Sequence, residues 1–152
     1  MLQTPIGEFR IIKNGTEIKY KEKKLPKKFG MYNNIEVDKR YQIQFNHVEK
    51  KSVVEFILEA KFQIDIEDQG SDEDLFYAVY NYKDLIIGVG VEGDIPGIEY
   101  EYLDEENKHG IKIIVSQNCQ TISMKVNVPW LRTTDKDQII NVQLAVDPCF
   151  YV

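Results

Sequence analysis

The chain has few of the residues that build metal and redox sites. Its 152 residues include two cysteines and two histidines. Cys119 and Cys149 show no Cys-x-x-C spacing and have no histidine beside them, so the sequence predicts no zinc or thioredoxin-like site. A chain of this length buries a core without a covalent or metal staple. We therefore expect a reduced chain in the cytoplasm with no metal or other cofactor. The spacing leaves open whether the two cysteines pair.

Long hydrophobic runs are also missing. The longest, around Leu85 to Val91, has about seven residues, whereas a membrane-spanning helix needs roughly 18. The first ten residues have neither the basic nor the apolar segment of a signal peptide. The phosphate-loop, dinucleotide-binding and nucleophile-elbow motifs do not occur either. We therefore expect no membrane contact, and no motif indicates an enzyme class.

What the chain does have is alternation of apolar and polar residues. From Val54 to Ile66 every even position is apolar, while the odd positions are mostly charged or amide residues. A period of two places successive side chains on opposite faces, so a long strand with one dry face is predicted over 53–67. Similar alternation over 35–48 predicts a second long strand. We expect these two strands to pair as a hairpin.

Further strands are predicted along the rest of the chain. Asn14-Gly15 between two extended segments predicts a type I′ hairpin turn. The run 85–91 is apolar in both phases, which predicts a strand buried on both faces. Additional strands are expected at 75–82, 99–103, 111–116, 121–128 and 138–146, and a short helix competes only at 73–82. The prediction is one all-β domain over 1–152: an antiparallel sandwich of roughly nine or ten strands, with a partly closed barrel as the alternative and little or no helix.

The net charge of −6 is unevenly distributed. Residues 1–30 carry a net charge of +5, and residues 31–152 carry −11. We expect residues 1–30 to form a basic hairpin and arm, which either folds back on the acidic body or meets a partner. Lysine-rich arms contact phosphates, but the acidic body opposes a polyanion. We therefore do not expect a nucleic-acid partner.

Two acidic stretches contain no basic residue. Residues 65–74, expected to form a loop, hold six carboxylates, and residues 92–106 hold seven. As a calcium loop beginning at Asp65, the first stretch has Phe76 where a bidentate Glu is required, so no calcium site is predicted. Acidic surfaces that carry tyrosine suit recognition of a basic protein. The predicted partner-binding residues are Asp65, Glu67, Asp68, Asp72, Glu73, Asp74, Glu99, Tyr100, Glu101 and Tyr102.

The two histidines form no catalytic pattern, and no catalytic residue is predicted. His47 lies in the apolar phase of its strand and is expected to be half-buried, whereas His109 lies in a polar turn and is expected to be solvated. The leading hypothesis is a non-enzymatic protein-binding module, concretely an inhibitor or immunity-type protein, that binds a basic partner through acidic loops and strand edges. One alternative is a structural or assembly subunit that contacts copies of itself, like a phage or viral β-sandwich. A further alternative is a small-ligand binder or enzyme with a cavity near His47.

Overall fold

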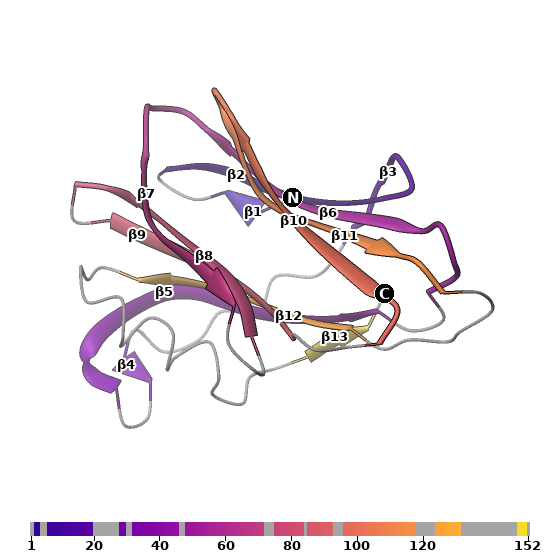
Figure 1. Ribbon diagram of the computed structural model, residues 1–152. Coiled ribbons are helices and arrows are strands. Elements are labelled where there is room, and N and C mark those ends of the chain that lie inside the picture. The colour runs from indigo at the N-terminus through magenta and orange to yellow at the C-terminus, as the bar shows by residue number, and fades with distance from the viewer. Residues whose placement is uncertain are drawn as a thin grey trace.

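Two β-sheets lie face to face in this protein (Figure 1). The computed structural model describes residues 2–3, 6–19, 28–29, 32–45, 48–71, 75–83, 85–92, 96–117, 124–131 and 149–151. In these residues the regular structure is all strand, and the strands form two open sheets instead of a closed barrel. Nine of the described strands have seven or more residues. The prediction of an antiparallel β-sandwich is confirmed.

The first sheet has the strand order β1-β2-β6-β11-β10, with β3 paired to β2. Its strands are β1 (Leu2–Gln3), β2 (Gly7–Lys13), β3 (Thr16–Glu17), β6 (Val53–Ala60), β10 (Ile98–Glu105) and β11 (Lys108–Val115). The second sheet has the order β13-β5-β12-β9-β8-β7, with β4 paired to β5. Its strands are β4 (Lys28–Phe29), β5 (Tyr32–Phe45), β7 (Asp65–Ser71), β8 (Leu75–Tyr82), β9 (Leu85–Glu92), β12 (Met124–Leu131) and β13 (Cys149–Tyr151). The described strand pairs are antiparallel except β13 with β5, and β10 and β7 are edge strands.

The core lies between the sheets because one phase of most long strands is apolar, β7 being the exception. Phe9 and Phe56 from the first sheet and Phe45 and Tyr80 from the second are fully buried. Phe45 meets Phe56 edge to face, with ring centroids 6.0 Å apart, and this contact joins the two sheets. Full burial of each large side chain stabilises the fold by about 1.5–3 kcal/mol.

Two local predictions are confirmed. Asn14 and Gly15 form the turn between β2 and β3 with φ values of 51° and 82°, both positive as a type I′ turn requires. Residues 86–91 of β9 are all buried, and β9 lies between β8 and β12 in its sheet. A strand that is covered on both faces reads as a continuous apolar run, as this one does.

The predicted hairpin between 35–48 and 53–67 is wrong. β5 pairs with β12 in the second sheet, whereas β6 pairs with β2 and β11 in the first. The chain therefore changes sheet between these strands. The strand at 53–67 also ends early, at Ala60, because residues 61–64 cross back to the second sheet and begin β7. Phe62 and Ile66 are consequently 46% and 37% exposed, although the alternation predicts that they are buried.

The prediction of an acidic loop at 65–74 is wrong for its described residues, because 65–71 form β7. An edge position allows this: β7 pairs with β8 on one side while its carboxylates remain in water. The helix alternative at 73–82 is also wrong, since 75–82 form β8. His47, residues 72–74, Cys119 and the predicted strand at 138–146 lie outside the described residues. In the described part of the chain, no helix has the length and apolar character to cross a membrane.

Candidate functional site

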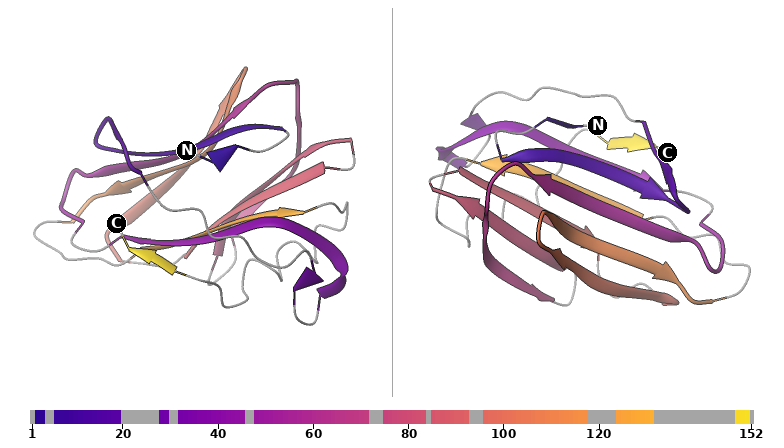
Figure 2. Two further views of the ribbon diagram at one scale, coloured as in Figure 1. Left: turned by 180° about the vertical axis from the view of Figure 1, so that it is seen from behind. Right: turned by 90° about the horizontal axis from the view of Figure 1, so that it is seen from above.

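The two acidic stretches come together along one side of the sandwich. β10 is an edge of the first sheet, β7 is an edge of the second, and Figure 2 shows both strands on the same side of the molecule. Their residues include seven carboxylates and neither lysine nor arginine. We call these two strands the acidic edge. Residues about 30 apart in the sequence thus lie on one side of the molecule, and Lys112 of the neighbouring strand β11 is opposite Glu101 in the register.

Tyr102 holds the two strands of the acidic edge together. Its hydroxyl donates a 2.8 Å hydrogen bond to the backbone carbonyl of Gly70 in β7. Its ring stacks on Phe76 of β8 at 4.5 Å between centroids, and Tyr100 stacks on the same ring at 4.9 Å. Burial is the main cause that raises the pKa of the Tyr102 phenol to about 12, so the hydroxyl keeps its proton and remains a donor. The spacing of the two edges is therefore set by contacts between the sheets.

The carboxylates of the acidic edge point mainly to solvent. Along β10 the exposed Glu99 and Glu101 alternate with the half-buried Tyr100 and Tyr102. The tyrosines therefore pack inward and position the edge, while the glutamates form its outer surface. In β7, Asp65 and Glu67 are exposed. Glu67 lies at a β-bulge and accepts a 2.7 Å hydrogen bond from the side-chain amide of Asn81.

Exposed apolar side chains lie where the acidic edge begins. Phe62 is in the connection between β6 and β7, and its ring stacks on Tyr82 at 4.7 Å between centroids. Ile66 follows as the second residue of β7. Phe62 and Ile66 are the exposed large hydrophobic residues of the described chain. We call Phe62, Ile66 and Tyr82 the apolar patch.

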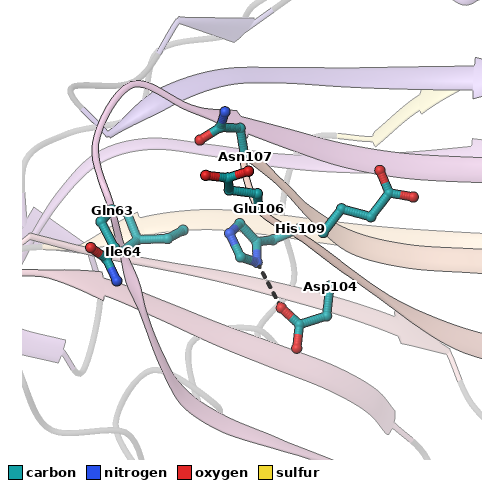
Figure 3. A pocket seen from close by; sticks show the side chains of 7 residues that line it. Gln63, Ile64, Asp104, Glu106, Asn107 and His109 are labelled. Atoms are coloured by element: carbon teal, nitrogen blue, oxygen red, sulfur yellow. Dashed lines mark ion pairs between the residues drawn. The ribbon is translucent and has the colours of Figure 1, made fainter.

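A polar pocket of about 450 Å³ opens beside the start of β7. Gln63 and Ile64 line it from the connection into β7, and residues 104–107 and His109 line it from the β10–β11 hairpin. Figure 3 shows the imidazole ring of His109 in the middle of these side chains. The pocket lies between the connection that crosses from one sheet to the other and the β10–β11 hairpin of the first sheet.

His109 is buried, and the prediction of a solvated histidine is wrong. The residue is 6% exposed, because it shares the inward phase of β11 with Ile111, Ile113 and Val115. Its ring is 5.4 Å from that of Tyr80. Its Nδ1 atom is paired with Oδ1 of Asp104 at 3.3 Å, the dashed line in Figure 3, and Asp104 is directly opposite in the β10–β11 register. The geometry of this ion pair does not make a hydrogen bond, and Nδ1 has no other partner among the described residues. A buried nitrogen without a hydrogen bond is unusual and costly.

The structure brings all of the described predicted site residues into one region and adds others. Asp65, Glu67, Asp68, Glu99, Tyr100, Glu101 and Tyr102 all lie on the acidic edge. Asp72, Glu73, Asp74 and the predicted cavity at His47 lie outside the described residues. The sequence reasoning missed the apolar patch and the His109 pocket. Residues 109, 111, 113 and 115 alternate along one strand, and this pattern could have predicted that His109 is buried with the three apolar residues.

The described residues contain no group of three or more His, Cys, Asp or Glu side chains arranged to hold a metal ion. The lining of the pocket presents carboxylate, amide and imidazole groups that can form hydrogen bonds. No family model, curated protein or solved structure matches this chain.

Proposed function

We propose that this protein is a non-enzymatic binding module, of the inhibitor or immunity type, that binds a basic protein through the acidic edge. The observation that carries the proposal is the position of two acidic strands without a basic residue, one from each sheet, on the same side of the sandwich. A basic partner would neutralise the negative side chains of these two strands.

The electrostatics of this side favour fast recognition. A surface of one sign steers an oppositely charged protein and raises its association rate, and salt weakens the effect. Glu99 and Glu101 are exposed on β10, and Asp65 and Glu67 are exposed on β7. The partner's surface should accordingly be rich in lysine or arginine.

The apolar patch would supply the desolvated centre of the interface, which charged side chains alone do not form. Protein interfaces have a desolvated centre with aromatic anchors, surrounded by a polar rim. Phe62 is 46% exposed, and its ring is already held against Tyr82, so binding would fix few additional rotamers. In this proposal the patch forms the centre of the interface and the acidic edge forms its rim.

The test compares three tagged proteins as baits in an extract of the native host, at low and at high salt. They are the wild type, the edge variant Glu99→Lys/Glu101→Lys and a control variant, Glu17→Lys/Glu49→Lys. All four glutamates are exposed, and Glu17 and Glu49 are outside β7 and β10. The two variants have the same net charge because each replaces two glutamates by lysine. Size-exclusion chromatography of each bait shows whether it binds copies of itself.

We expect one basic protein to bind the wild type and the control at low salt, and to be lost at high salt and from the edge variant. Titration of that purified protein should then show at least about tenfold weaker binding to the edge variant. Equal binding to both variants would refute the role of the acidic edge. Recovery of the bait alone, as an oligomer, would refute the proposal in favour of a self-assembling subunit.

A further inference from the structure

The outer edge of β10 is the long, regular edge among the described strands. β1 and β13, which end the two sheets on the other side, have two and three residues. β7 has a bulge between Ile66 and Asp68, and its Gly70 carbonyl already accepts the hydrogen bond of Tyr102. β10 runs for eight residues without a register shift against β11, and Figure 2 shows it at the margin of the first sheet. Of the described edges, β10 is therefore the best suited to accept another strand.

The hydrogen bonds of the first sheet show which backbone groups of β10 face this edge. The amide of Ser116 donates to the carbonyl of Gly97, one residue before β10 begins. Hydrogen-bonded residues alternate along an antiparallel pair, so the odd-numbered residues of β10, such as Glu101, bond to β11. The even-numbered residues, such as Ile98 and Tyr102, direct their N–H and C=O groups to the other side, where no described strand pairs with β10.

The side chains along β10 favour a basic strand and disfavour a second copy of β10. Glu99 and Glu101 are exposed on the outer face of the sheet. Two copies paired antiparallel, with their outer faces aligned, would place a glutamate opposite a glutamate in every register that pairs more than half of β10. Like charges directly opposite each other destabilise a strand pair, whereas opposite charges stabilise it. The sheet already has such an arrangement on the other side, where Lys112 of β11 is opposite Glu101.

We infer that the protein partner adds an extended segment, with lysine or arginine at alternate positions, to β10 as an antiparallel strand. This inference rests on the proposed function and states how the partner is held. The described strand pairs of the first sheet are all antiparallel, so the added strand would continue the same pattern. Its basic residues would lie opposite Glu99 and Glu101 in the non-hydrogen-bonded pairs, where side chains are closest.

The edge is held in place before a strand arrives. Tyr100 and Tyr102 point inward and stack on Phe76 of β8, with ring centroids 4.9 and 4.5 Å apart. Tyr102 is also hydrogen-bonded to β7. Because β10 is fixed to the second sheet in this way, binding of a strand would order few groups of this protein.

The test titrates the capped peptide T-K-V-K-T-K-V into the full-length protein at low salt, so it does not depend on finding the partner. Two N-methylated forms keep its sequence and charge. Methyl groups on the central valine and threonine amides block N–H groups that would face β10, whereas methyl groups on two lysine amides block N–H groups that would face water. The peptide K-K-K-T-V-T-V has the same composition without the alternation. Binding and amide exchange with deuterated water are followed by NMR.

We expect the amides of Ile98 and Tyr102 to exchange at least about tenfold more slowly when the peptide is bound, because each gains a hydrogen-bond acceptor. The Glu101 amide, which is bonded to β11, should change little. Methylation of the valine and threonine, and the edge variant, should each weaken binding at least about tenfold. Methylation of the lysines and the control variant should not, and the amide spectrum of each variant shows that it is folded.

No binding of the alternating peptide, or binding without slower exchange at Tyr102, would overturn the inference. Equal binding of the peptide with adjacent lysines, or equal losses from the two methylated forms, would also overturn it. Each of these results would leave the proposed function standing if the acidic edge still captures a basic protein from the extract. A loss on methylation of the lysines alone would overturn the antiparallel direction, because a parallel strand would turn those amides toward β10.

Discussion

Replacing Tyr102 by phenylalanine tests whether the two strands of the acidic edge are held together as the structure shows. Tyr102→Phe removes one hydroxyl and keeps the ring that stacks on Phe76. The variant loses the 2.8 Å hydrogen bond to the carbonyl of Gly70, which is the described hydrogen bond between β10 and β7. The change therefore isolates one polar contact between the sheets without creating a large cavity.

The expected cost follows from the position of this bond. A net hydrogen bond contributes about 0.5–1.5 kcal/mol, and a partly buried carbonyl that loses its donor adds to the loss, so the free energy of unfolding should fall by about 1–2 kcal/mol. For a domain of this size that corresponds to a Tm lower by about 2–8 °C. The control is Tyr82→Phe, because the Tyr82 hydroxyl has no hydrogen bond to the described residues. Equal Tm values for the two variants in calorimetry would refute the role given to Tyr102.

The same variant has a signature at alkaline pH. The folded protein raises the pKa of Tyr102 from 10.0 to about 12, mainly through burial. A raised pKa means that the folded state holds its proton more tightly than the unfolded state, so this stabilisation is complete below pH 10 and is lost as the pH rises toward 12. Burial also raises the pKa of Tyr80, which adds to the alkaline loss. Tyr102→Phe should therefore show a shallower fall in stability between pH 10 and 12 than the wild type in denaturant titrations. A slope identical to that of the wild type would contradict this assignment.

Three further predictions concern the partner surface and the backbone. Phe62→Ser should weaken binding of the basic partner by about tenfold or more, measured by titration. It should lower the free energy of unfolding by only about 1 kcal/mol, because Phe62 is half exposed. A loss of binding free energy no larger than the loss of stability would contradict its role as an anchor. Gly110→Ala should lower the free energy of unfolding by about 3 kcal/mol or more in denaturant titrations, since a Cβ there would meet the Phe56 carbonyl and Gly110 has a φ of 150°. Gly15→Ala should cost about 1–2 kcal/mol in the same titrations, because its φ of 82° is strained for alanine but nothing lies near the added methyl; a cost as large as that of Gly110→Ala would contradict the distinction.

The secondary structure of this chain is largely readable from alternation and turn residues. Asn14-Gly15 predicts its turn because few residue pairs tolerate two positive φ values. The apolar residues of β9 and β11 likewise predict that these two segments are strands. The prediction goes wrong at Ala60, where the alternation continues through Phe62 to Ile66 but the strand does not. Alternation reports which residues share a face, and it carries no information about where the chain leaves one sheet for the other.

The sequence by itself determined the all-β class, the dry face of most long strands and the two acidic stretches. It could not determine that these stretches would lie side by side, because backbone hydrogen bonds are alike for every strand pair and do not select partners. Only the tertiary structure placed β7 and β10 at edges of different sheets and joined them through Tyr102 and Gly70. Only the crossing of residues 61–64 exposed Phe62 and brought Gln63 to His109. The chemical groups of the site can thus be identified from the sequence, but their proximity depends on the order of the strands in the two sheets.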